Sequence, residues 1–322
     1  MEGAKMNRSA LQSRSAATPC STFRGASGRR VFLAAALLGV NAPFAALAQA
    51  VLPPLVQPPS TEHHVGKVIL LELITPDLGS SRSFYSQLFG WSFRDVPLRS
   101  VTYAEASLDS VPVAGFLQKE RPAGGRPPAW LAFFAVPDVD AAVRSATERG
   151  ATLLFGPRTF ADRGREAVLS DPQGAVFGLL SSSSGDPPDY LATPGEWIWS
   201  SLITTDPDSA AAFYQAVFGY EVHQLAGSEG AQHLLFASRN YARASVNSLP
   251  RTSSDARPHW INYVRVVDAE QSAAKAQALG GRLLVPPRPD RQGGKLAVVA
   301  DTIGAAFGLL EWPEAFNKQV QP

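Results

Sequence analysis

The fold is decided by Thr75-Pro-Asp-Leu-Gly-Ser-Ser-Arg-Ser-Phe-Tyr-Ser-Gln-Leu-Phe-Gly-Trp91, because this pattern returns 129 residues later as Thr204-Thr-Asp-Pro-Asp-Ser-Ala-Ala-Ala-Phe-Tyr-Gln-Ala-Val-Phe-Gly-Tyr220. A second pattern, Asp171-Pro-Gln-Gly-Ala-Val-Phe-Gly-Leu-Leu180, returns as Asp301-Thr-Ile-Gly-Ala-Ala-Phe-Gly-Leu-Leu310. A unit of about 130 residues is too long for a solenoid repeat and has the usual size of a compact domain. The chain is therefore predicted to contain two consecutive, related domains.

Each unit divides into two shorter modules that open with a strand and a capped helix. Val68–Thr75 is apolar and strand-like, Asp77 is a helix-capping residue, and Gly90 is suited to the left-handed position that ends the helix. Residues 130–150 repeat this plan in the first unit, and residues 266–280 repeat it in the second. Because short strands follow every helix, the sequence predicts an α+β protein of four βαβββ modules, two per domain.

The first fifty residues have the features of an export signal. Arg29-Arg30 is followed by an apolar, alanine-rich run, and the segment closes with Ala48-Gln49-Ala50, a small-x-small cleavage pattern. Residues 28–33 resemble a twin-arginine signal, and an ordinary secretory signal is the alternative. A permanent membrane anchor is not expected, because Asn41 and Pro43 interrupt the run short of roughly 20 apolar residues. We expect export through the twin-arginine machinery to the periplasm or beyond.

Charge and cysteine content exclude several classes of function. The net charge is +1, but residues 1–50 carry six cations against one anion, which leaves the remainder mildly acidic. An acidic body has no electrostatic reason to bind nucleic acid. The single cysteine, Cys20, lies in the segment expected to be removed, so no disulfide or cysteine nucleophile is expected in the mature protein.

Proline-rich and serine-rich stretches set the expected boundaries. The predicted segments are a signal peptide at 1–50, a stiff proline-rich tether at 51–65, domain one at 66–182, a linker at 183–195, domain two at 196–313 and a tail at 314–322.

The two repeated patterns resemble those of a known superfamily. A strand, an aspartate and a helix that carries Phe-Tyr and ends in Phe-Gly-Trp or Phe-Gly-Tyr resemble the opening of a vicinal oxygen chelate domain, as found in glyoxalases, bleomycin resistance proteins and dioxygenases. Asp-Pro-x-Gly-Ala-x-Phe-Gly-Leu resembles the closing strand. The resemblance frames both domains and is greatest to tandem bacterial members. It implies that the two modules of each domain form a curved mixed sheet around a cavity.

The same resemblance implies where metal ligands would stand, one on each of four strands. These places fall on Leu70, Leu131, Gly178 and a residue near Gly115 in domain one, and on Trp199, Ile261, Gly308 and a residue near Val246 in domain two. None of these side chains ligates a cation, and a slip of one residue would move each position to the other face of its strand. The sequence therefore predicts no bound metal and no other cofactor.

Glu72 and Ser201 are candidate site residues on the first strand of each domain. Glu72 shares the strand face of Leu70 and is thus expected to face the cavity, where it could orient a polar ligand or act as a base. It could equally be neutralised by an arginine or by backbone donors. Its repeat mate, Ser201, cannot do the same work, so the two cavities are expected to differ. Glu72 is the one weak catalytic candidate.

Domain two supplies the aromatic and cationic candidates. Trp199 and Tyr263 could stack on a planar ligand, although large aromatic side chains are more often part of a core. Arg265 could pair with an anionic ligand or lie exposed on its strand. The paired loops Arg163-Gly-Arg165 and 291–295 could close over a ligand or be solvated connections.

Together these features predict an exported protein of the glyoxalase/bleomycin-resistance type that binds a small apolar or aromatic molecule without metal. One alternative is a lyase, isomerase or dioxygenase of the same superfamily with non-standard site residues. Another is a protein-interaction module of the cell envelope with vestigial pockets.

Overall fold

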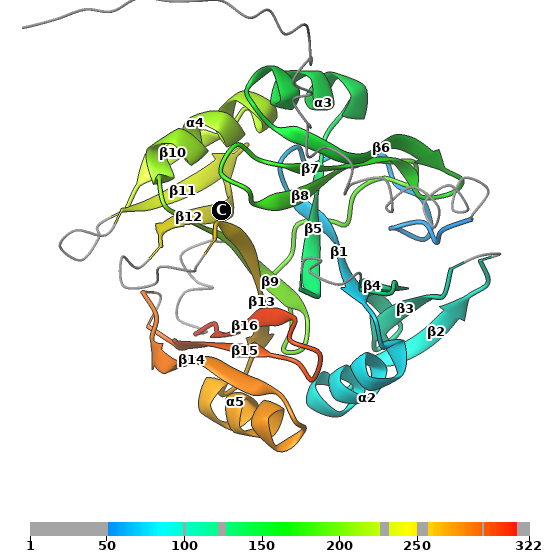
Figure 1. Cartoon of the computed structure of the whole chain (residues 1–322), viewed down its shortest axis with the longest axis vertical. Helices are drawn as coiled ribbons and strands as arrows, with labels where there is room; N and C mark the ends of the chain where they lie inside the picture. The colour runs from blue at the N-terminus through cyan, green and yellow to red at the C-terminus, as the bar shows by residue number, and fades with distance from the viewer. Residues whose placement is uncertain are drawn as a thin grey trace, which may run out of the picture. The chain divides into compact units, whose positions relative to one another are not determined.

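The computed structural model describes residues 51–98, 101–121, 127–225, 232–249, 257–291 and 293–313, all of which belong to one compact unit (Figure 1). The predicted signal segment at 1–50 and the tail at 314–322 lie outside the described residues. Among the helices of the described part, none has the length and apolar character needed to cross a membrane.

Four modules of one helix and four strands follow one another along the chain. The first is β1 (Val68–Thr75), α2 (Leu78–Phe89), β2 (Ser92–Val96), β3 (Tyr103–Leu108) and β4 (Val111–Gln118). The second is β5 (Ala129–Ala135), α3 (Val139–Glu148), β6 (Thr152–Phe160), β7 (Gly164–Ser170) and β8 (Val176–Ser182). The third is β9 (Trp197–Thr204), α4 (Pro207–Phe218), β10 (Glu221–Gln224), β11 (His233–Ser238) and β12 (Tyr241–Ser248). The fourth is β13 (His259–Val266), α5 (Ala269–Ala278), β14 (Arg282–Pro289), β15 (Lys295–Ala300) and β16 (Ala306–Glu311).

Each domain forms one mixed sheet of eight strands. The strand orders are β2-β3-β4-β1-β5-β8-β7-β6 and β10-β11-β12-β9-β13-β16-β15-β14. At the centre of the first sheet, β1 runs parallel to β4 and antiparallel to β5, which places Glu72 beside both Gly115 and Leu131. The second sheet repeats this register with Ser201 beside Ser245 and Ile261. The predicted α+β fold of paired βαβββ modules is confirmed.

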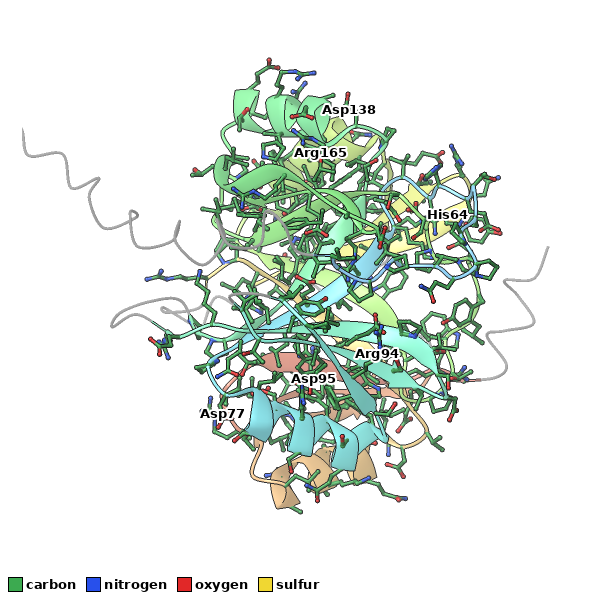
Figure 2. The ribbon with its side chains drawn as sticks, turned by 90° about the vertical axis from the view of Figure 1, so that its right-hand side faces the viewer. His64, Asp77, Arg94, Asp95, Asp138 and Arg165 are labelled. Carbon is green, nitrogen blue, oxygen red and sulfur yellow. The ribbon has the colours of Figure 1, made fainter. Side chains whose placement is uncertain are left out.

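Local signals position the helices as the sequence indicates. The side chain of Asp77 accepts a hydrogen bond from the amide of Ser80 at the start of α2, and Asp138 accepts one from Ala141 at the start of α3 (Figure 2). Gly90 ends α2 with φ of 79°, in the left-handed region that favours glycine. These caps satisfy backbone groups that a helix end otherwise leaves unpaired.

One face of each sheet packs against the helices and forms a core that the two domains share. Helix α2 lies beside α5, and α3 lies beside α4, so each contact joins a helix of domain one to a helix of domain two (Figure 1). Leu71 and Leu73 of β1 belong to the same buried cluster as Val264 of β13 and Phe307 of β16. The other, concave face of each sheet is left for the cavities.

The repeated motifs meet across this shared core. The hydroxyl of Tyr85 donates to Asp301 Oδ2 at 3.1 Å and accepts from Trp130 Nε1 at 2.9 Å. Asp301 also accepts from the backbone N–H groups of Ile303 and Ala305. Burial raises the pKa of the Tyr85 hydroxyl well above its ordinary value, so this phenol stays protonated and donates.

Because the two domains repeat each other, a second copy of this arrangement joins them. It consists of Trp260, Tyr214 and Asp171, with hydrogen bonds of 3.0 Å from Tyr214 to Asp171 and 3.0 Å from Trp260 to Tyr214. Each arrangement takes its aspartate from one domain and its aromatic pair from the other. The repeated sequence motifs therefore also supply residues that join the two domains.

Candidate functional site

The concave face of domain one carries the positions at which the family resemblance implies metal ligands. Leu70 and Leu131 pack there in a cluster with Phe133. A Cβ atom at Gly178 would lie 2.3 Å from Phe133 Cδ1, so the phenyl ring fills the space above this glycine. Hydrocarbon and hydrogen thus stand where ligand atoms would be needed. Within the described residues, no group of three or more His, Cys, Asp or Glu side chains could hold a metal ion.

A buried ionic cluster stands beside this apolar surface. Tyr103 donates its hydroxyl to Glu72 Oε1 at 2.7 Å, and Arg163 Nη1 lies 3.4 Å from the same oxygen. Arg163 Nη2 also donates to the Tyr103 hydroxyl at 3.3 Å. Glu72 is therefore neutralised by an arginine, the second of the two roles considered from the sequence.

Glu166 of strand β7, three residues after Arg163, completes the cluster. Its Oε1 lies 3.9 Å from Arg163 Nη1 and has no hydrogen-bond partner. Burial and the adjacent carboxylate of Glu72 raise the pKa of Glu166 to about 8, so it is largely protonated at neutral pH. With Glu166 neutral, the positive charge of Arg163 and the negative charge of Glu72 balance.

The β6–β7 turn holds Arg163, and the structure divides the roles of its two arginines. Arg163 is 2% exposed and contacts Glu72 and Tyr103, whereas Arg165, labelled in Figure 2, forms a bidentate pair with Asp140 at the start of α3. Arg163 thus belongs to the buried cluster, and Arg165 joins the turn to a helix. The alternation of side chains along β7 could have placed Glu166 on the concave face. No pattern in the sequence, however, indicates that Arg163 contacts Tyr103.

The concave face of domain two is largely apolar, and Arg288 and Asp290 are close enough to act electrostatically on Tyr263. Ile261, Tyr263 and Leu310 are buried there, and Trp199 packs against them while staying partly exposed. The indole N–H of Trp199 donates to Ser245 Oγ at 3.0 Å. Of the predicted residues, Trp199, Ser201 and Tyr263 are thus brought together on one face.

Ser201 and Ser245 add a polar point to this face. Their hydroxyl oxygens are 2.7 Å apart, at the place that Glu72 and Gly115 occupy in domain one. Ser245 was missed from the sequence, which placed the fourth-strand position near Val246. Val246 instead belongs to the shared core, since adjacent strand residues face opposite sides.

Among the described residues of domain two, the positions equivalent to Tyr103 and Glu166 carry other side chains. Tyr103 is replaced by His233, which contacts Asn247, and Glu166 is replaced by Leu296. Burial lowers the pKa of His233 and raises the pKa of Tyr263 to about 12, so both side chains are neutral at pH 7. The two cavities therefore differ in chemistry. The sequence predicts this difference, because Ser201 occupies the position in domain two that Glu72 occupies in domain one.

Arg265 does not serve as a free cation for a ligand. Its Nη1 donates to the carbonyl of Ala192 at 2.7 Å, and its Nη2 donates to the carbonyl of Trp312 at 3.3 Å. The guanidinium holds the linker and the end of the second sheet. The strand position of Arg265 was read from the sequence, but these backbone acceptors arise only in the folded chain.

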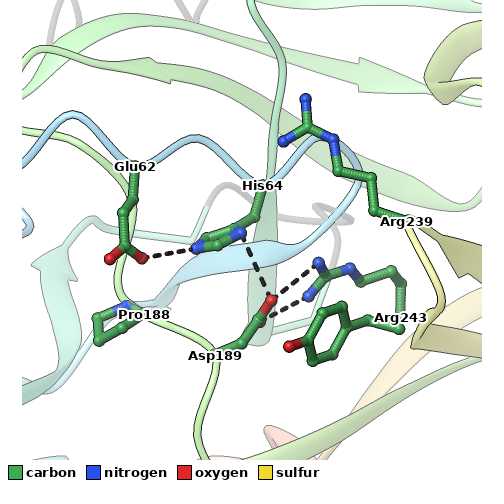
Figure 3. A pocket seen from close by; sticks show the side chains of 7 residues that line it. Glu62, His64, Pro188, Asp189, Arg239 and Arg243 are labelled. Carbon is green, nitrogen blue, oxygen red and sulfur yellow. Dashed lines mark hydrogen bonds and ion pairs between the residues drawn. The ribbon is translucent and has the colours of Figure 1, made fainter. Parts of the chain in front are cut away.

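A surface cavity of about 340 Å³ lies where the linker meets β12 (Figure 3). His64 lies between Glu62 and Asp189, at 3.1 Å and 3.4 Å, and Arg243 forms a bidentate pair with Asp189. Burial opposes ionisation of Asp189, but hydrogen bonds from Arg243 and Lys67 lower its pKa to about 2. Since these charges already pair with one another, the cluster stabilises the linker.

Comparisons with known proteins agree with this architecture. Residues 63–179 match the model of the Glyoxalase/Bleomycin resistance protein/Dioxygenase superfamily, and residues 200–310 match that of a Glyoxalase-like domain. CFP32 of Mycobacterium tuberculosis, which carries a provisional glyoxylase name, is 32% identical over 79% of this chain and 98% of its own length. The anthracycline biosynthesis protein DauV of a Streptomyces species is 29% identical over 76% of this chain and 93% of its own length.

Solved structures share the fold at low sequence identity. The Mn(II)-bound glyoxalase of Novosphingobium aromaticivorans has a TM-score of 0.55 at 15% identity, covering 77% of this chain and 83% of that chain. A variant of homoprotocatechuate 2,3-dioxygenase from B. fuscum has a TM-score of 0.54 at 14% identity, covering 80% and 73%. The chain belongs to the glyoxalase/bleomycin resistance protein/dioxygenase superfamily, with one such domain in each half.

Proposed function

We propose that the protein binds a small, planar aromatic molecule on the concave face of domain two, without a metal ion. The observation that carries this proposal is the cluster of Trp199, Ile261, Tyr263 and Leu310 beside a pair of serine hydroxyls. Aromatic side chains supply stacking area, and a few polar groups fix the orientation of a ligand. Tyr263 and His233 are themselves uncharged at pH 7, so they can offer hydrogen bonds without a charge of their own.

The relatives support the same class of ligand. One similar protein is named for anthracycline biosynthesis, and anthracyclines are planar aromatic compounds. A family scaffold can keep its cavity while its chemistry changes, so the argument rests on the residues of this face and not on the fold.

We expect Trp199→Ala to weaken binding of a hydroxylated anthraquinone by about 10- to 100-fold, because a tryptophan that stacks on a ligand is a typical centre of binding energy. Calorimetric titration of the full chain measures this change. Tyr241→Ala is the matched control, since Tyr241 is an aromatic residue 49% exposed outside this cluster, and it should leave the affinity unchanged. Equal affinities of the Trp199 variant and the parent would refute the proposed site.

We also propose that the protein acts outside the cytoplasm, on the basis of Arg29-Arg30 and the small residues at Ala48 and Ala50. Replacing both Arg29 and Arg30 with lysine should retain the full-length chain in the cytoplasm. Arg24→Lys is the control and should be exported like the parent. Fractionation followed by N-terminal sequencing checks both outcomes. Unchanged export of the double variant would exclude the twin-arginine route.

A further inference from the structure

Residues 51–56, the first part of the segment predicted as a tether, pack against the concave face of domain one (Figure 1, blue). Leu52 is 4% exposed and packs against a cluster that includes Tyr103, Leu117 and Phe160. Leu55 packs against the separate cluster of Leu131 and Phe133. The two leucines thus fill two apolar sites on the same concave face.

Polar contacts hold the segment between these two sites. Arg163 Nε donates to the carbonyl oxygen of Pro53 at 2.6 Å. The backbone N–H groups of Leu55 and Val56 both donate to Ser184 Oγ, at 3.0 Å and 3.2 Å. The segment therefore makes the contacts that a bound peptide would make: two anchored side chains, one carbonyl on a buried donor and two amides on a hydroxyl.

The residues around the segment also contact one another. Arg163 is held by Glu72 and Tyr103 through its Nη atoms, which leaves its Nε to donate to the segment. Glu166 Oε1 is buried and lacks a hydrogen-bond partner, which leaves a second polar group available to a ligand. Since Arg163 and Glu72 balance in charge, the site favours a neutral ligand.

We propose that the cavity of domain one is a second binding site, specific for short, neutral, apolar peptides with a leucine on either side of a proline carbonyl, and that residues 51–56 occupy it as an intramolecular ligand. This site is separate from the aromatic site of domain two. A covalently attached ligand competes at an effective concentration in the millimolar range. A free peptide therefore binds weakly until the segment is displaced.

The test uses the full chain and the acetylated, amidated hexapeptide of residues 51–56 as the probe. The double variant Leu52→Ser, Leu55→Ser should bind this peptide at least about tenfold more tightly than the parent, because the apparent affinity scales with the fraction of open sites. The matched control is Val51→Ser in the same segment, since Val51 is 56% exposed, and it should behave like the parent. A hexapeptide with serine at both leucine positions should not bind.

Hydrogen exchange at the amides of Leu55 and Val56 gives an independent readout. Both amides should be protected in the parent, where Ser184 Oγ accepts from them, and should lose protection when excess hexapeptide displaces the segment. The single variant Leu55→Ser changes only the attached segment, so it should also bind the peptide more tightly, and it decides the question if the double leucine variant does not fold.

Three results would overturn the proposal. They are a folded double leucine variant whose peptide affinity equals that of the parent, a Leu55→Ser variant with unchanged affinity, and a dimer in which residues 51–56 occupy the cavity of a second copy. Anthraquinone binding should be the same in all of these variants. The outcome at domain one is thus distinguishable from failure of the site proposed in domain two.

Discussion

Replacing Asp301 with alanine is expected to lower the free energy of unfolding by about 3 kcal/mol, because three donors then lose their buried acceptor. These donors are the hydroxyl of Tyr85 and the backbone N–H groups of Ile303 and Ala305, and Asp301 itself is 2% exposed. The loss arises at a contact between the two domains, so it should weaken the whole described unit. Urea denaturation monitored by tryptophan fluorescence measures it.

Two further variants control this experiment. Tyr85→Phe removes one of the three donors and leaves Trp130 Nε1 without its acceptor, so about 1–2 kcal/mol is expected. Asp171→Ala changes the equivalent residue of domain one and should lower the free energy of unfolding by about as much as Asp301→Ala. Asp171 accepts from an equivalent set of donors, namely the hydroxyl of Tyr214 and the backbone N–H groups of Gln173 and Ala175. A loss below about 0.5 kcal/mol for Asp301→Ala, the size typical of a surface substitution, would show that these contacts do not hold the domains together.

Glu166→Gln is expected to remove a large part of the pH dependence of stability. Glu166 has an ordinary pKa of 4.5 in the unfolded chain and a pKa of about 8 in the fold, where burial and Glu72 disfavour its charge. The folded state therefore holds the proton more tightly than the unfolded chain does. The contribution of Glu166 to stability is largest below about pH 4.5 and is lost as the pH rises to about 8, by at most about 1.4 kcal/mol per pH unit.

Because glutamine stays neutral, the variant should escape this loss. Between pH 5 and pH 8 the parent should lose about 3 kcal/mol more than Glu166→Gln, and at pH 8 the variant should be the more stable protein. Glu148→Gln is the matched control, since the Glu148 side chain is 74% exposed, and its profile should follow that of the parent. Parallel profiles for the parent and Glu166→Gln would mean that Glu166 is already ionised in the fold at neutral pH.

Local and periodic features were accessible from the amino-acid sequence. Asp77 and Asp138 cap their helices as predicted, because a cap depends on residues three positions away. Strand parity placed Leu70, Leu131 and Trp199 on the concave faces, since successive side chains of a strand alternate. The repeat and the family follow from patterns of the same short range.

Long-range pairings were not accessible in this way. The prolines of the segment at 51–56 predict a stiff, extended tether, but the segment packs against domain one through contacts with Ser184 and Arg163, more than 100 residues away. The acceptors of Arg265 likewise come from the linker and the end of the last sheet. The sequence shows that a buried arginine or backbone amide needs a hydrogen-bond partner, but it does not show which residue supplies that partner.

The amino-acid sequence alone thus determined the modules, their order, the face on which each strand residue lies and the absence of ligand atoms at the implied metal positions. Tertiary structure alone decided that Tyr85 meets Asp301, that Arg163 neutralises Glu72 and that the chain fills one of its own cavities. The reason is physical. Periodicity and capping act over a few residues, whereas burial obliges each polar group to take whichever partner the fold brings within about 3 Å.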